Sequence, residues 1–303
     1  MSTVFTRGER FVFEQGRPLD RARLRFHFAS GPARAVLDEL AAYQNDDGGF
    51  GHALEPDLRT PVSSAVATWC AATVLHEVGA VAGEPLVRRM VGYLLDTYDA
   101  AGHRWWIVPP QTEDAPRAPW WAYADIGATF GGCLLNPTAG LAGALWEYQE
   151  LVPRAMLAEL TEAVLGRLEA GAESTLDRGD LTAAELFVQA GNLPDGARLR
   201  AVTALRRAAA RLVENQPQAW TEYLLQPLDV AHTPDSPLSP AVDQSSIAAN
   251  LDYLVGLQLP DGSWPLTWNW SEVDADAWRL AEREAKGIVA VDRLLTLRAY
   301  GRR

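Results

Sequence analysis

One short segment, residues 51–64, concentrates side chains that could do acid–base chemistry. It reads GHALEPDLRTPVSS and holds two carboxylates, Glu55 and Asp57, together with a cation, Arg59. A carboxyl group at a cavity wall can act as a general acid, because burial raises its pKa and a neighbouring group can adjust it further. The same residues also suit helix capping, with Arg59 paired to Glu55 or Asp57, and both interpretations stay open.

Two other polar segments offer candidate catalytic or ligand-binding residues. Asp47 stands in residues 44–50, QNDDGGF, and is a third candidate acid, although an aspartate before Gly-Gly is also typical of a turn. His232 lies in the proline-rich segment 226–240, which the sequence predicts to be a long loop. Long loops in compact domains are often functional lids, so His232 is a candidate base or ligand-binding residue, or else a surface histidine.

The chain has eleven tryptophans in 303 residues, well above usual abundance. Their ring faces can stabilise a carbocation by about 0.5–2 kcal/mol each, bury an isoprenoid chain, or stack on a sugar. Packing in a helical core is the simpler interpretation for any single tryptophan, and it is weaker for those in proline-rich loops. The residues that we predict to bind substrate are Arg59, Trp69, Trp106, Trp121, Tyr123, Trp268, Trp270 and His232.

Helices are the elements that must position these side chains. Apolar residues recur at helical intervals along most of the chain, and no segment alternates as a strand would. Thr60-Pro61 and Ser239-Pro240 each join a preferred N-cap residue to a proline, so each is expected to open a helix. The sequence predicts an all-α fold, with helices over residues 19–43 (broken at 30–32), 60–79, 136–146, 153–170, 180–191, 195–215, 239–257 and 275–300.

Three segments share one pattern, in which a helix ends at a glycine turn that is followed by an aromatic residue. They begin near Leu40, Leu94 and Leu254, which are 54 and 160 residues apart, or about one and three units of 53. A unit of that length suits two helices and their connections. Repeated helical pairs favour a ring of hairpins over a simple bundle.

Two of these segments, QNDDGGF at 44–50 and QLPDGSW at 258–264, read Gln, three residues, Gly, one residue, aromatic. The Gln amide can bond backbone groups at a neighbouring helix end, the Gly allows the turn, and the ring covers it. This pattern resembles the repeat of squalene and oxidosqualene cyclases and of protein prenyltransferase β-subunits, and the chain is similar to bacterial prenyltransferase-like proteins. The resemblance implies a single (α/α) toroid domain over residues 1–303, with up to six helical hairpins around a central cavity.

Composition excludes several classes of function. With 27 basic against 39 acidic side chains and a net charge of −12, a surface that binds nucleic acid is not expected. Two cysteines are too few for a disulfide framework or a four-cysteine zinc site. The first ten residues have no apolar run typical of a signal peptide, and no apolar stretch is long enough to span a membrane, so a cytoplasmic protein is expected.

The cofactor motifs of the resembling families are missing from the sequence. Asp274-Ala-Asp276 lacks the third acid of the class II cyclase motif, and Asp46-Asp47 is followed by Gly-Gly-Phe rather than by a diphosphate-binding sequence. The histidines stand singly, and no zinc constellation can be traced among them. No cofactor is therefore predicted, and Mg²⁺ has no motif to support it.

The function predicted from the sequence is acid-initiated chemistry on an isoprenoid, as in a cyclase or isomerase. Asp57, Glu55 or Asp47 would protonate an alkene or epoxide, and the tryptophans would hold the cation of a small hydrophobic substrate. Two alternatives stay open: a toroid that binds a hydrophobic ligand or partner without catalysis, and a glycan hydrolase or lyase with two carboxylates and tryptophan subsites. A closed apolar chamber with one acid favours the cyclase, whereas an open groove with facing carboxylates favours the glycan enzyme.

Overall fold

The computed structural model describes residues 3–125 and 135–302, and these residues are built from helices. They contain no β-strand, only isolated bridges, so the prediction of an all-α fold is confirmed. The α-helices of these ranges are α1 (Val4–Gln15), α2 (Pro18–Phe28), α3 (Ala33–Ala41), α4 (Ala65–Glu77), α5 (Pro85–Asp96), α7 (Leu135–Glu147), α8 (Arg154–Gly171), α9 (Arg178–Gln189), α10 (Asp195–Leu212), α11 (Pro227–Val230), α12 (Gln244–Gly256) and α13 (Ala275–Ala299).

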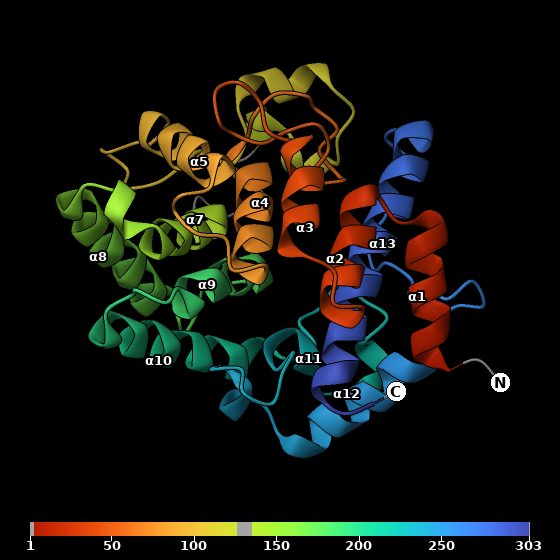
Figure 1. Ribbon diagram of the computed structural model, residues 1–303. Helices are drawn as coiled ribbons and strands as arrows, with labels where there is room; N and C mark the ends of the chain where they lie inside the picture. The colour runs from red at the N-terminus through yellow and green to blue at the C-terminus, as the bar shows by residue number, and fades with distance from the viewer. Residues whose placement is uncertain (1–2, 126–134, 303) are drawn as a thin grey trace.

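Neighbouring helices in the chain pack on one another, and the last helix returns to the first (Figure 1). Helix α2 packs on α3, α7 on α8 and on α9, α10 on α8 and on α9, and α11 on α12. Helix α13 packs against both α1 and α2, so the two ends of the chain lie side by side. The toroid implied by the sequence resemblance stays a prediction.

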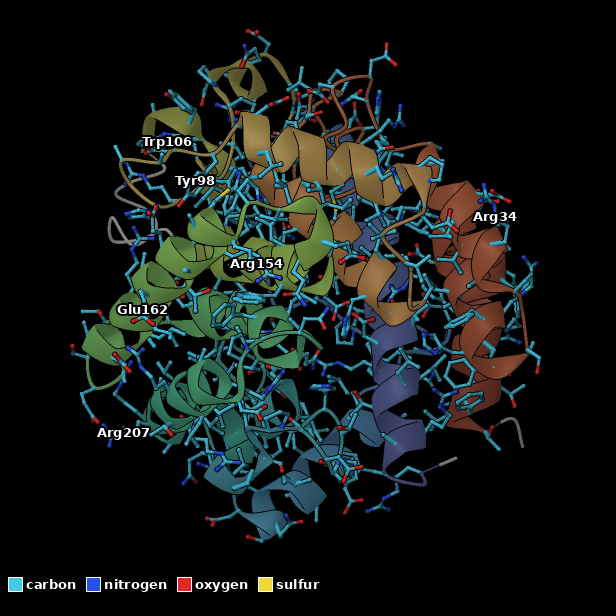
Figure 2. The ribbon with its side chains drawn as sticks, turned by 60° about the vertical axis from the view of Figure 1, so that its left-hand side comes forward. Arg34, Tyr98, Trp106, Arg154, Glu162 and Arg207 are labelled. Carbon is cyan, nitrogen blue, oxygen red and sulfur yellow. The ribbon has the colours of Figure 1, made fainter. Side chains whose placement is uncertain are left out.

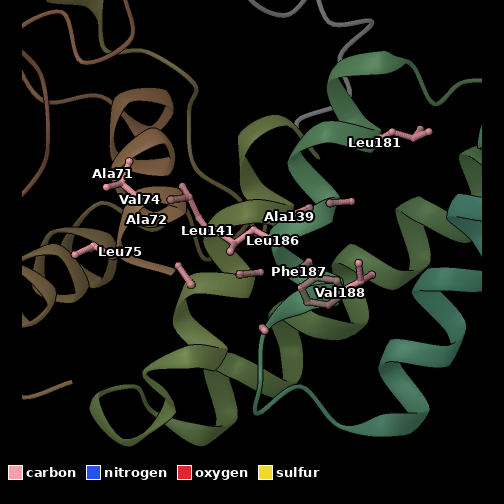
Figure 3. Packing of buried hydrophobic residues seen from close by; sticks show 14 of the residues in the cluster. Ala71, Ala72, Val74, Leu75, Ala139, Leu141, Leu181, Leu186, Phe187 and Val188 are labelled. Atoms are coloured by element: carbon pink, nitrogen blue, oxygen red, sulfur yellow. The ribbon is translucent and has the colours of Figure 1, made fainter. Parts of the chain in front are cut away.

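Small side chains allow α4, α7 and α9 to approach closely in the core (Figure 3). Ala71 of α4, Ala139 of α7 and Phe187 of α9 are completely buried in this contact. A Cβ added to Gly143 of α7 would lie 2.5 Å from the carbonyl oxygen of Leu186 on α9, so only glycine fits there. The core therefore fixes α4 beside α7 and α7 beside α9.

The Gln-Gly-aromatic turn that follows α3 bonds this helix to α5. The amide Nε2 of Gln44 donates to the carbonyl oxygens of Gly48 at 2.9 Å and of Leu86 at 3.0 Å. In return Arg89 of α5 donates through Nε to Oε1 of Gln44 at 2.9 Å. Gly48 has φ +89°, and a Cβ there would lie 2.2 Å from the carbonyl oxygen of Arg89. One amide thus closes its own turn and docks the next helix, as its residue types predicted.

The same arrangement joins the end of α12 to the beginning of α1. Gln258 donates through Nε2 to the carbonyl oxygens of Gly262 and of Val4, both at 2.9 Å. Arg7 of α1 donates through Nε to Oε1 of Gln258 at 2.9 Å. Gly262 has φ +96°, and its added Cβ would lie 2.2 Å from the carbonyl oxygen of Arg7. We call this set of contacts the clamp. Around Gln44 the clamp links α3 to α5, and around Gln258 it links α12 to α1.

Elsewhere the turns keep this position and use other side chains. After α5, Arg167 of α8 donates to the carbonyl oxygens of Gly102 and His103. After α8, Arg211 of α10 donates to the carbonyl oxygen of Leu176 at 2.7 Å. Each of these arginines comes from another helix, as Arg89 and Arg7 do at the two glutamine turns.

Several predicted helix boundaries are wrong. Thr60-Pro61 does not open a helix: α4 begins at Ala65, where the hydroxyl of Ser64 accepts from the amide of Ala67 at 3.2 Å. Ser239-Pro240 forms only a short 3₁₀ turn, and α12 begins at Gln244. The predicted loop 226–240 contains the short helix α11, and helices α1 and α5 lie outside the predicted ranges. At the beginning of α4, the cap formed by Ser64 outweighs the Thr-Pro signal four residues earlier.

We predict that Gly262→Ala destabilises the protein by roughly 2–4 kcal/mol, because the new methyl group meets a backbone oxygen and alanine disfavours a positive φ. Urea unfolding followed by circular dichroism measures the change. Gly166→Ala is the matched control, since it lies within α8 with no atom near its Cβ position. That control should stabilise the protein by about 0.5–1 kcal/mol. Equal stability of the two variants would contradict the clamp.

Candidate functional site

A cavity of about 770 Å³ lies between helices α4, α9, α11, α12 and α13, with residues 264–268 forming part of its wall. This volume falls within the range of small-molecule sites in proteins. Aromatic rings and charged groups both line it, and the lining includes Trp69, His76, Glu77, Arg178, Thr182, Glu185, Gln189, Asp229, His232, Tyr253, Trp264, Trp268, Asp292, Arg293 and Arg298.

Arg23 of α2 bridges two helices of the cavity wall, α4 and α13. It bonds Glu77 of α4 at 2.8 Å and Asp292 of α13 at 3.0 Å, and His27 bonds the same Glu77 at 2.5 Å. Arg23 is buried, so its charge needs these two carboxylates. Burial raises the pKa of Asp292, although the charge of Arg23 opposes that shift.

Further ion pairs follow the cavity wall from helix to helix. Asp229 of α11 lies 3.4 Å from a guanidinium nitrogen of Arg178 on α9 and 3.5 Å from one of Arg293 on α13. His232 bonds Glu185 of α9 at 2.9 Å. The wall therefore carries many charged groups that are paired with one another, while most of the surface it exposes to the cavity is apolar.

A second histidine–glutamate pair joins α4 to α7. His76 bonds Glu147 at 3.0 Å, and this hydrogen bond raises the pKa of the imidazole. The carboxylate of Glu147 also accepts from the amide of Gly191 at 3.2 Å, just beyond the end of α9. This pair therefore connects the ends of α4, α7 and α9.

Asp57, the first predicted acid, lies beside the cavity and is 5% exposed. Its Oδ1 accepts from the indole Nε1 of Trp270 at 2.7 Å. Burial raises the pKa of Asp57, and the indole groups of Trp270 and Trp268 and the charge of Arg59 offset part of that rise. Asp57 is thus held by tryptophans and does not point into bulk water.

Glu55, the second predicted acid, is partly buried close to Asp57. Burial, together with the negative charge of Asp57, raises the pKa of Glu55 to about 7. The thiol of Cys70 on α4 donates to its Oε2 at 3.7 Å. The charge of Glu55 also helps to raise the pKa of Tyr223, whose ring lies 6.2 Å from that of Trp268 on the cavity wall. Glu55 is not among the residues that line the cavity, but its partner Cys70 follows the lining residue Trp69 on α4.

A second hydrophobic cluster, the tryptophan cluster, carries the loop that holds both acids. Its members are buried residues of several segments, with Trp69, Trp120, Leu266 and Trp268 packed against them: Leu58, Val66, Ile107, Val108, Ala118, Trp121, Trp270, Ala277, Trp278 and Ala281. Trp270 and Trp278 meet edge to face, with ring centroids 5.7 Å apart. The cluster positions the acids next to the beginnings of α4 and α13.

The other predicted residues lie in different surroundings. Trp69, Trp268 and His232 line the cavity, and their role in binding a ligand stays a prediction. Asp47 completes its turn by accepting from the amide of Gly49 and the hydroxyl of Ser63, so it matches the turn interpretation. Arg59 pairs with Glu284 at 2.8 Å and makes no ion pair with Glu55 or Asp57, which corrects that expectation.

Four of the predicted aromatic residues do not line the cavity, and one of them, Trp270, bonds Asp57 instead. Trp106 lies at the outer edge of the molecule, 47% exposed, with the guanidinium of Arg104 stacked 4.3 Å from its ring (Figure 2). Tyr123 is 37% exposed, and Trp121 is buried in the tryptophan cluster. None of them lines this cavity, so their role as substrate-binding residues stays a prediction.

The charged lining residues were missed because they come from separate helices. One signal was available in α9, where polar residues recur at helical intervals along an otherwise buried helix: Arg178, Thr182, Glu185 and Gln189. Such a polar stripe on a core helix marks a face that does not enter the hydrophobic core.

No family model, no curated protein and no solved structure matches this chain. Within residues 3–125 and 135–302, no set of three or more His, Cys, Asp or Glu side chains is arranged to hold a metal ion. None of the helices in these ranges is both long and apolar enough to cross a membrane.

We predict that Glu55→Gln stabilises the protein at high pH. The folded state raises the pKa of Glu55 from its ordinary 4.5 to about 7. It therefore holds this proton more tightly than the unfolded chain, so ionisation costs stability as the pH rises from about 4.5 and costs it fully above about 7. The variant should exceed the wild type by about 1–3 kcal/mol at pH 8 and match it near pH 4, as urea unfolding measures. A difference independent of pH would contradict this environment.

Proposed function

We propose that the helical pairs close into an (α/α) toroid around the cavity, and that the cavity binds a polyhydroxylated ligand, a saccharide, on which Glu55 acts as proton donor. The packing of α1 on α13 and the Gln258 clamp between α12 and α1 support a closed ring. The ion pairs Arg23–Asp292 and Arg293–Asp229 support it from the cavity side.

The proposed ligand class rests on the lining of the cavity, which combines tryptophans with paired charged groups. More than half of the lining residues are polar or charged, although apolar atoms make up most of the surface that they expose to the cavity. An isoprenoid against them would displace water without replacing its hydrogen bonds, which costs free energy for each polar group buried. Sugar hydroxyls donate and accept with such groups, while Trp69 and Trp268 offer ring faces for the sugar's apolar side.

Glu55 suits the role of a proton donor because its pKa of about 7 lies near neutral pH. A general acid works best when its pKa is close to the working pH, since it is then both protonated and acidic enough. Its contact with Cys70, the residue after Trp69 on α4, places it behind one wall of the cavity. In this role Glu55 gives its proton to the leaving oxygen of a glycosidic bond.

Acid-initiated isoprenoid chemistry is the second candidate. The tryptophan cluster around Asp57 favours it, because indole faces stabilise positive charge. The two candidates differ in what must enter the cavity, so direct binding measurements separate them.

Isothermal titration with neutral, acidic and amino oligosaccharides, and with farnesyl diphosphate, tests the ligand class. We expect an oligosaccharide to bind and Trp268→Ala to weaken it about 10-fold to 100-fold through loss of stacking. Trp106→Ala, on the outer surface, is the control and should leave the affinity unchanged. Binding of farnesyl diphosphate alone would replace the saccharide proposal with the isoprenoid one.

The Glu55→Gln variant tests the catalytic role on whichever oligosaccharide binds. We expect the release of reducing ends to fall by about 10²-fold to 10⁴-fold, because the amide cannot donate an acidic proton. The dissociation constant should change by less than threefold. Turnover at the wild-type rate would reject Glu55 as the acid, and binding without any turnover in the wild type would identify a binding protein.

A further inference from the structure

We propose that His232 is the proton acceptor within the cavity, with Glu185 as its positioning residue. This inference rests on the proposed function, because it completes the acid–base pair that a saccharide-cleaving enzyme requires. Both residues line the cavity, and neither is needed to explain the clamps or the hydrophobic core.

The hydrogen bond between the two side chains determines which ring nitrogen faces the ligand. Nδ1 of His232 lies 2.9 Å from Oε1 of Glu185, so the ionised carboxylate stabilises the tautomer that keeps its proton on Nδ1. Among residues 3–125 and 135–302, no group makes a hydrogen bond to Nε2. Nε2 is therefore the nitrogen available to a bound hydroxyl group or water molecule.

The backbone around His232 is fixed from two sides. The carbonyl oxygen of Ala231 accepts from the hydroxyl of Tyr300 at 2.7 Å. In the preceding helix α11, the amide of Leu228 donates to Oδ1 of Asn250 at 3.0 Å. Glu185 lies in the middle of α9, whose core face is buried. Because helices and bonded backbone hold both partners, the dyad is positioned before any ligand arrives.

The charges around His232 favour its protonated form. Burial disfavours the imidazolium, but the hydrogen bond and charge of Glu185 on α9 and the charge of Asp292 on α13 outweigh it and raise the pKa of His232. The other charged groups on these walls, Arg178 on α9 and Arg293 on α13, share Asp229 of α11 between them. A base whose protonated form is stabilised in this way accepts a proton readily.

The proposed step balances as a hydrolysis. A water molecule gives one proton to Nε2 of His232, and its oxygen forms a bond to the anomeric carbon. The glycosidic bond from that carbon to the leaving oxygen breaks, and the leaving oxygen takes the proton of Glu55. Glu185 stays ionised throughout and stabilises the imidazolium. Exchange with solvent then returns a proton to Glu55 and removes one from His232.

Proton NMR titration of the five histidines tests the dyad without any ligand. The His232 signal, assigned with His232→Gln, should titrate above 6.5 in the wild type, and Glu185→Gln should lower its pKa by about one unit or more. Glu147→Gln is the matched control, because Glu147 pairs with His76: it should move the His76 signal and leave that of His232 unchanged. An unchanged His232 titration in Glu185→Gln would overturn the dyad.

Kinetics on the oligosaccharide found by titration calorimetry test the catalytic role. His232→Gln should lower kcat at least 100-fold with KM within threefold, and should remove the acidic limb of the pH–rate profile. Glu185→Gln should move that limb to lower pH. His52→Gln, outside the cavity, is the control. Full turnover in His232→Gln with loss in Glu55→Gln would reject this inference and keep the proposed function. Failure of every oligosaccharide to bind or react would reject both, whatever the titration shows.

Discussion

The side-chain amide of Gln258 is the contact on which the arrangement of the whole chain depends. It bonds the turn after α12 to the first residue of α1, and Arg7 returns a bond to the same side chain. This contact joins groups more than 250 positions apart in the sequence. With α1 docked there, α13 lies against α1 and α2, and Arg23 of α2 can reach Asp292. The charged wall of the cavity is therefore a consequence of closure at the turn.

The ion pairs of the cavity are a poor explanation of stability. Taking charges such as those of Arg23 and Asp229 out of water costs several kcal/mol each, and apolar side chains of similar volume often serve a fold equally well. The hydrophobic core here is extensive without them, and Gln44 and Gln258 already fix neighbouring helices. In the proposed function, these paired charges supply hydrogen bonds to the ligand, which is a role beyond the requirements of folding.

Local rules predicted the clamps, and tertiary contacts decided what local rules could not. The Gln, Gly and aromatic residues act within one turn, so their spacing carried their role. The capping of α4 by Ser64 rather than by Thr60 depends on how residues 50–64 lie against Phe50, which no local preference specifies. Tryptophans were ambiguous for the same reason: Trp105 and Trp264 bond backbone carbonyls in the core, Trp268 lines the cavity, and Trp106 lies outside. Their residue type is identical, and only their neighbours differ.

The pKa values of Glu55 and His232 are both raised, but by opposite kinds of surroundings. The pKa of Glu55 is raised by burial beside another carboxylate, which disfavours the charged form of Glu55. The pKa of His232 is raised by a carboxylate, which favours the charged form of His232. The first environment keeps Glu55 protonated to a higher pH, and the second makes His232 a better proton acceptor. The tryptophan cluster supplies the low polarity for one, and the polar face of α9 supplies the charge for the other. An entirely apolar cavity would have no carboxylate to raise the pKa of His232. In the proposed function, the charged groups of the cavity therefore matter for the mechanism as well as for the choice of ligand.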